Sequence, residues 1–198
     1  MSESVADPDI PGIFQDALRS IRSVEIRPEL VVQEIPAPEN LAPYSFALAA
    51  EVLGATRPDG SEHGQGRFVL LYDPAEPEAW GSAFRVICFV QAPIEQEMGV
   101  DPFVASVAWS WLIDALNGRD AKFGAASGTA TKVISTGFGE LAAQGDGSQL
   151  ELRASWSPHE SRLDAHVEGW GELLCMLAGL PPTEEGVTMI NSRRSARG

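Results

Sequence analysis

The segment from Asp101 to Gly118 constrains the fold of this chain more than any other. Asp101 is a good N-cap, and Pro102 suits the first helical position because its missing N–H would have no partner there. Asn117 and Gly118 supply the residues that commonly end a helix. The segment therefore predicts a helix over residues 101–118.

Apolar side chains surround this predicted helix on nearly every side at 100° per residue. Trp109 and Trp111 lie about 160° apart, so they cannot pack against the same neighbour. We expect one covering layer to be a sheet and the other to be a second helix or a partner subunit. Trp109 and Trp111 are accordingly the candidate interface residues.

Strands are predicted on both sides of the helix, because apolar side chains recur there with a period of two. Phe89 and Ile87 are apolar on one face of a strand whose other face is also apolar, so that strand is predicted to be central. Gly145–Gly147 is a strong hairpin signal. The predicted strands are Tyr44–Val52, Arg67–Asp73, Ser82–Ala92, Thr129–Ala142 and Ser148–Trp156, with Leu30–Ile35 as a candidate edge strand.

Two further helices are predicted over Gly12–Val24 and Ser161–Gly179. The resulting order α-β-β-β-α-β-β-α, with short connections between the first strands, indicates an α+β fold: an antiparallel sheet of about five strands with helices packed on it. We expect one domain over residues 12–180, with a flexible N-terminus at 1–11 and a flexible tail at 181–198.

The charge of the chain limits its partners. It has 198 residues, with 14 basic and 28 acidic side chains, for a net charge of −14. This charge repels phosphate backbones and makes direct nucleic-acid binding an unfavoured function. No apolar run approaches the ~20 residues that span a bilayer, and the first thirty residues lack a signal-peptide pattern, so we expect no membrane association.

The two cysteines are too few for a disulfide framework, which favours a reducing, cytoplasmic location. Cys88 is predicted to lie in the core, where a thiol is a small apolar group. Cys175 lies on the last predicted helix near Glu168 and Glu172, which are expected to face solvent and to raise its pKa. Both cysteines are therefore interpreted as structural.

The sequence does not contain the usual motifs that bind cofactors or metals. The glycine-rich segment 124–132 has no Gly-Lys-Ser/Thr and enters a predicted strand, unlike a phosphate-binding loop. His63, His159 and His166 have no paired-ligand spacing. We therefore expect neither a cofactor nor a metal.

Asp114 is the most informative polar residue, because it lies with Ser106 and Ser110 on an otherwise apolar helix. A buried carboxylate must be paired or hydrogen-bonded. The favoured interpretation is that this stripe reaches solvent or an arginine such as Arg85 in the adjoining sheet. The alternative is a catalytic role for Asp114, with His166 on the rim of the last helix as a second acid–base candidate.

Four segments, Trp109–Leu112, Ser135–Gly139, Val167–Trp170 and Gly179–Pro182, carry a resemblance to a family of actinobacterial proteins that is a domain of unknown function, DUF3000. The resemblance covers almost the whole chain and implies no activity. The element order also resembles that of the small acidic chaperones of type III secretion and the related sensory-transduction-regulator proteins. That second resemblance implies a dimer with the middle helix at its interface.

Two functional hypotheses follow. The preferred one is a non-enzymatic, acidic, chaperone-like module that forms a homodimer and binds an unknown protein partner. It rests on the apolar central helix, the acidic charge and the absence of a catalytic set. The alternative is a small-molecule enzyme or ligand-binding protein with its site between helix and sheet near Asp114.

Overall fold

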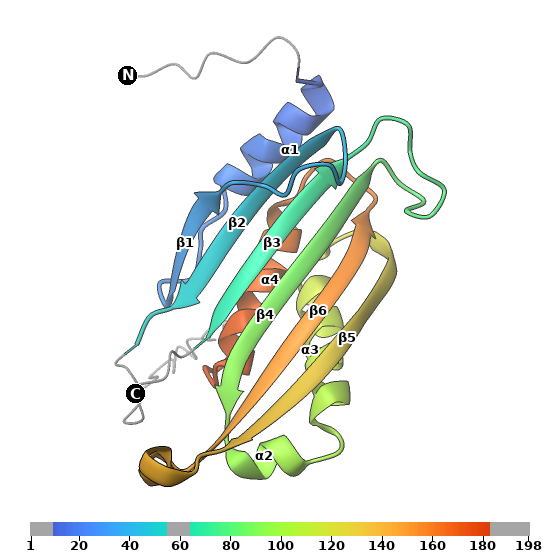
Figure 1. The fold of residues 1–198 in the computed structure, drawn as a ribbon. Coiled ribbons are helices and arrows are strands. Elements are labelled where there is room, and N and C mark those ends of the chain that lie inside the picture. Colours follow the sequence, from blue (N-terminus) through green and yellow to red (C-terminus); the bar gives the residue numbers. More distant parts are fainter. Residues whose placement is uncertain (1–9, 55–63, 183–198) are drawn as a thin grey trace, which may run out of the picture.

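The sheet of this protein has six strands. The computed structural model describes residues 10–54 and 64–182. All neighbouring strands are antiparallel, in the order β1-β2-β3-β4-β6-β5 (Figure 1). The α+β class is therefore confirmed. The candidate edge strand Leu30–Ile35 is present as β1, so the sheet has one strand more than the five predicted. The strands are β1 Leu30–Ile35, β2 Tyr44–Val52, β3 Gln65–Tyr72, β4 Phe84–Ile94, β5 Phe123–Thr136 and β6 Asp146–Pro158.

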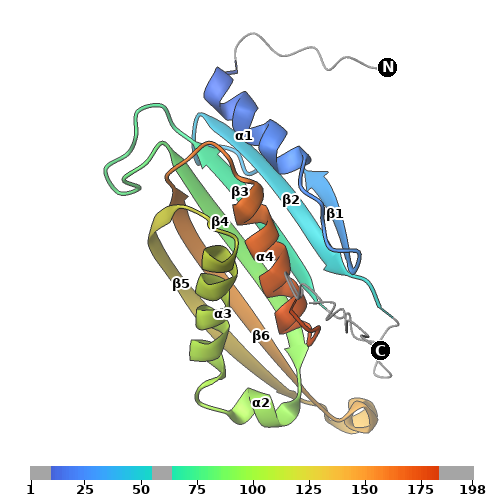
Figure 2. The ribbon, with the colours of Figure 1, turned by 180° about the vertical axis from the view of Figure 1, so that it is seen from behind.

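Three helices cover one face of the sheet. These are α1 Gly12–Arg22, α3 Val104–Gly118 and α4 Asp164–Leu177, and a short helix, α2 Gln96–Val100, lies between β4 and α3. In Figure 2, α4 crosses the middle of the sheet, with α1 over β1 and β2 on one side and α3 over β5 and β6 on the other. The helices thus form a single layer.

The hydrophobic core lies between this helix layer and the sheet. Strand residues alternate, so every second side chain points into the core. Phe68 of β3 and Trp156 of β6 are fully buried there. Trp170 of α4 packs against Phe68 with ring centroids 5.6 Å apart. Most of the ends predicted to be flexible, residues 1–11 and 181–198, lie outside the described part of the chain.

Two glycines allow α4 to lie close to its neighbours. A Cβ atom at Gly66 of β3 would lie 3.1 Å from the indole of Trp170. A Cβ atom at Gly169 of α4 would lie 3.0 Å from a methyl group of Leu116 and 3.4 Å from the backbone of Ala115 in α3. These close approaches fix the position of α4 against β3 and α3.

The central helix is less buried than the sequence predicts. It begins at Val104, and Asp101 accepts a hydrogen bond from the backbone N–H of Phe103 at 2.8 Å in the preceding turn. Phe103 and Val107 are 70% and 40% exposed. The predicted sandwich between two layers is wrong within the described residues: α3 contacts the sheet and a second helix, as expected, but that helix, α4, packs beside it in the same layer and leaves its remaining side exposed.

The β5–β6 connection also differs from the prediction. β5 begins at Phe123, six residues before the predicted strand Thr129–Ala142, and ends at Thr136. Thr136 is the register partner of Asp146, so Gly145–Gly147 does not form a two-residue turn. A 3-10 helix, Gly139–Gln144, fills the connection instead, and Gly145 with φ 73° ends it. The hairpin exists, but with a longer loop than predicted.

Glu172 of α4 is buried, so the prediction that it faces solvent is wrong. Its carboxylate accepts hydrogen bonds from Arg27 at 3.1 Å and Arg119 at 3.3 Å. Arg27 precedes β1 and Arg119 follows α3. A buried carboxylate is tolerated when cations and hydrogen bonds compensate it. This ion-pair network connects three parts of the chain.

Replacement of Gly66 by valine is expected to destabilise the fold, because the added methyl groups would overlap the fully buried indole of Trp170. Overpacking of this kind costs about 1–3 kcal/mol. Gly118→Ala is the control: a Cβ atom there has no neighbour within 4 Å. Urea denaturation followed by circular dichroism should show a lower midpoint for Gly66→Val alone. Equal midpoints for the two variants would contradict the close packing of α4 on β3.

Candidate functional site on the uncovered face of the sheet

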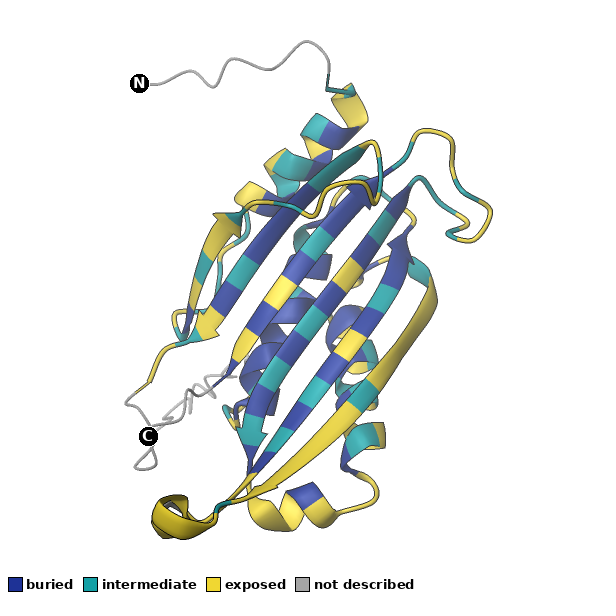
Figure 3. Cartoon of the chain, in the orientation of Figure 1, coloured by how far each residue is buried: buried dark blue, intermediate teal, exposed yellow. Residues whose placement is uncertain are grey.

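The face of the sheet opposite the helices is largely open to solvent. Figure 3 shows exposed and half-buried residues alternating with buried ones along β3, β4 and β6. We call the outward-pointing set the uncovered face; it includes the register-paired residues of the rows through Arg67, Ile87 and Gln91. Strand β4 is central in the sheet, as predicted, but the described helices pack against only one of its faces.

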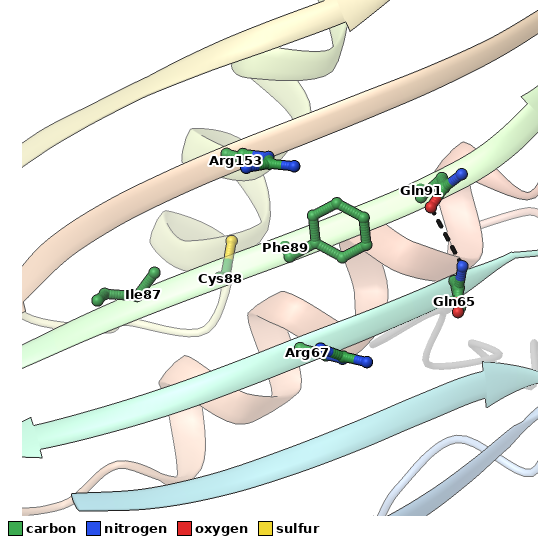
Figure 4. A pocket seen from close by; sticks show the side chains of 7 residues that line it. All are labelled: Gln65, Arg67, Ile87, Cys88, Phe89, Gln91 and Arg153. Carbon is green, nitrogen blue, oxygen red and sulfur yellow. Dashed lines mark hydrogen bonds between the residues drawn. The ribbon is translucent and has the colours of Figure 1, made fainter. Parts of the chain in front are cut away.

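A hollow of about 440 Å³ lies on the uncovered face around Phe89. Arg67 on β3 and Arg153 on β6 are both direct register partners of Phe89 on β4. These three side chains therefore form one row across three strands, with Arg67 and Arg153 on opposite sides of the ring (Figure 4). We call this site the Phe89 hollow; its lining also includes Gln65, Gln91, Ile87 and the strand at Cys88.

The polar groups of the Phe89 hollow are partly engaged. The guanidinium of Arg153 lies over the Phe89 ring, 5.6 Å from its centroid, and its Nε donates to Glu151 at 2.6 Å. Gln65 donates to Gln91 at 3.1 Å at one end of the hollow (Figure 4). Arg67 is exposed and forms no hydrogen bond or ion pair with another described residue. The hollow thus presents a cationic group on each side of an aromatic ring.

Arg85 has a structural role on the same face. Its guanidinium donates to the backbone oxygen of Ala125 at 2.9 Å and to the hydroxyl groups of Ser157 and Ser155. These bonds connect β4, β6 and β5. Because Arg85 points away from the helices, the predicted alternative that it meets Asp114 is wrong.

Asp114 and His166 occupy different environments. Asp114 is exposed on α3, so the prediction that its stripe reaches solvent is confirmed. His166 on α4 is fully buried. Its Nδ1 accepts a hydrogen bond from the Trp156 indole at 3.0 Å. One ligand cannot contact an exposed carboxylate and a fully buried imidazole together, so the structure does not bring these two candidates into one site.

Trp109 and Trp111 point to different neighbours, as their spacing predicts. Both are half-buried and pack against the core. Trp109 lies over β5, where a Cβ atom at Gly128 would be 2.8 Å from the indole. Trp111 lines a cavity of about 200 Å³ between α2, β4 and the end of α4, together with Met98 and Met176. Their role in an interface remains a prediction.

The comparisons with known proteins identify the family and no activity. A family model described as a protein of unknown function, DUF3000, matches residues 10–188. The chain belongs to this family. No curated protein and no solved structure matches it. Within residues 10–54 and 64–182, no helix is long and apolar enough to cross a membrane.

Sequence reasoning for this DUF3000 member did not identify the Phe89 hollow. The period of two on β4 places Phe89 and Ile87 on one face, but the apolar residues on both faces predict that both are covered. The residues that distinguish the hollow lie on the neighbouring strands, where both partners of Phe89 are arginines. Strand register, which the sequence does not specify, was needed to place them side by side.

The two thiols are buried in positions that suppress their reactivity. Burial raises the pKa of Cys88 to about 12 and that of Cys175 to about 11, so both thiols resist deprotonation. Arg27 opposes the shift at Cys175 without reversing it. Among the described residues, no three His, Cys, Asp or Glu side chains cluster in a way that could hold a metal. His63 lies outside the described residues.

His166 is expected to make folding stability depend on pH. Desolvation lowers its pKa to about 4, whereas an unfolded histidine titrates near 6.5. The contribution of neutral, buried His166 to the free energy of unfolding is therefore fully present above pH 6.5 and is lost as the pH falls toward 4. A shift of this size corresponds to about 3 kcal/mol.

The variant His166→Gln, which cannot titrate, should remove this part of the pH dependence. Urea denaturation between pH 7 and pH 4 measures it. His159→Gln is the matched control, because His159 is exposed. If His159→Gln flattened the profile and His166→Gln did not, the assignment of this pH dependence to His166 would be refuted.

Proposed function

We propose that this protein is a non-enzymatic, chaperone-like module that holds a partner polypeptide against its sheet. The observation that carries the proposal is the one-sided cover of the sheet by the described residues: α1, α3 and α4 lie on one face, and none of the described helices lies on the other. Large exposed surfaces with mixed apolar and polar side chains are typical of protein-binding sites. An extended chain could lie along or across these strands.

The shape of the uncovered face supports a polypeptide over a buried small-molecule substrate. The hollow around Phe89 is formed by side chains of three strands that stand on one sheet surface, rather than by walls from two facing layers. The alternative of an enzyme near Asp114 loses support, because Asp114 is exposed and His166 is enclosed by the core. We retain the expected cytoplasmic location as part of this proposal, since Cys88 and Cys175 are free and buried.

A homodimer formed through β5 is the second part of the proposal. β5 is a 14-residue edge strand whose one partner among the described strands is β6, and such edges readily add another strand. Neighbouring strands lie about 4.8 Å apart. Because α3 lies over β5 and β6, two copies joined antiparallel at β5 would bring their α3 helices about 10 Å apart, which is a normal packing distance.

The surface of α3 is compatible with this arrangement. Ser106 and Ser110 are small and exposed, so they would permit close approach of the second helix. Val107, at 40% exposed, would gain cover. Trp109 lies over β5, next to the proposed junction. The dimer would therefore bury the side of α3 that the chain leaves uncovered.

The dimer is tested with two matched substitutions on opposite edges of the sheet. Val133 on β5 and Val31 on β1 both lie on the uncovered face and are 43% and 48% exposed. We expect light scattering to show a dimer for the wild type and Val31→Glu. Val133→Glu should weaken association by up to about tenfold, because each copy would bring a carboxylate to the shared edge, and like charges on paired strands repel each other. A monomeric wild type, or equal dimerisation of all three proteins, would contradict this arrangement.

Holding of a polypeptide is tested by site-specific photocrosslinking of the full chain in a host lysate. The photoreactive residue benzoylphenylalanine replaces Ile87 on the uncovered face or, as control, Asp16 on the exposed side of α1. We expect one discrete, stoichiometric polypeptide adduct from the Ile87 position and none from the Asp16 position. No adduct, or the same adducts from both positions, would refute the proposed function.

A further inference from the structure

The charge of the uncovered face differs from that of the whole protein. Of the described strand residues that point to this face, Arg67, Arg85 and Arg153 are basic, and Glu51 and Glu151 are acidic. The whole chain has 28 acidic residues against 14 basic ones. Arg85 is bound within the sheet, which leaves Arg67 and Arg153 to attract a ligand that carries negative charge.

Both arginines of the Phe89 hollow are exposed and can bind such a ligand. Arg67 is exposed and has no hydrogen-bonding or ionic partner among the described residues. Arg153 uses its Nε for Glu151, and its side chain remains 67% exposed. A guanidinium offers a planar fork of donors that fits both oxygens of a carboxylate. Each side of Phe89 can therefore receive one carboxylate.

The other lining residues suit the main chain and apolar side chains of a peptide. The half-buried Phe89 ring lies between the two arginines and can contact an apolar side chain. Gln65 and Gln91 place amide donors and acceptors at one end of the hollow. Ile87, 37% exposed, lies in the next row of the sheet. A hollow of about 440 Å³ accommodates a few side chains of an extended segment.

We infer that the Phe89 hollow recognises an acidic peptide segment, with carboxylates on Arg67 and Arg153 and an apolar side chain between them on Phe89. This inference rests on the proposed function, because it names the kind of polypeptide that the uncovered face holds. A long polyanion such as nucleic acid is disfavoured, because most of its phosphates would lie near the strongly acidic remainder of the protein.

The inference is tested by fluorescence anisotropy with the full chain and a fluorescein-labelled peptide, Gly-Gly-Glu-Gly-Phe-Gly-Glu-Gly, whose two glutamates and phenylalanine project from the same side of an extended chain. A second peptide carries lysine in place of both glutamates. The double variant Arg67→Gln, Arg153→Gln removes the two arginines of the hollow. The control double variant Arg19→Gln, Arg162→Gln removes two exposed arginines outside the uncovered face, so both variants have the same net charge.

We expect the glutamate peptide to bind the wild type and the control variant with similar affinity, and the lysine peptide to bind neither at this hollow. Binding of the glutamate peptide should weaken by at least about tenfold in the Arg67→Gln, Arg153→Gln variant. No binding of the glutamate peptide, equal loss in both variants, or equal binding of the lysine peptide would overturn the inference. Preferential, Arg67- and Arg153-dependent binding of an eight-nucleotide oligothymidylate would also overturn it.

The crosslinking experiment separates this inference from the proposed function. When benzoylphenylalanine at Ile87 is combined with Arg67→Gln and Arg153→Gln, loss of the polypeptide adduct supports the acidic-peptide inference. Persistence of the adduct supports the proposed function but refutes the role of the two arginines. Absence of an adduct with both arginines present refutes the proposed function itself.

Discussion

The contact between the Trp170 indole and the bare backbone of Gly66 sets the position of α4 on the sheet. A large aromatic side chain can lie this close to a strand only where the strand has no side chain in the way. Trp170 then reaches Phe68, and Trp156 donates to His166 on the same helix. With α4 held over the middle of the sheet, α1 and α3 occupy the remaining space on either side of it (Figure 2).

A single helix layer gives the two faces of the sheet different compositions. The helix side is occupied by large apolar residues such as Leu70, Val86 and Leu152, all essentially buried. The opposite side combines arginine, glutamine, serine and a few apolar residues, which is a surface that water can solvate and a partner can contact. The arginine pair on either side of Phe89 stands out against the acidity of the chain as a whole.

The sequence predicted local structure better than long-range contacts. β2 has the predicted bounds, Tyr44–Val52, because a period of two over nine residues leaves little ambiguity. α1 begins at Gly12 as predicted, since its apolar stripe is narrow and regular. The buried state of Glu172 could not be predicted, because its partners Arg27 and Arg119 are 145 and 53 residues away. Periodicity likewise shows that Phe89 and Ile87 share a face, but not whether that face is covered.

The position of β5 has a consequence for the order in which the chain can fold. β1 to β4 are sequential neighbours and can pair as soon as each strand follows the last, whereas the described neighbour of β5 is β6, which comes later in the chain. During synthesis at about 5–20 residues per second, the 22 residues from Gly137 to Pro158 take about one to four seconds to emerge. For that interval β4 has an open edge and β5 has no strand to join, so β6 completes the sheet by inserting between two strands made before it.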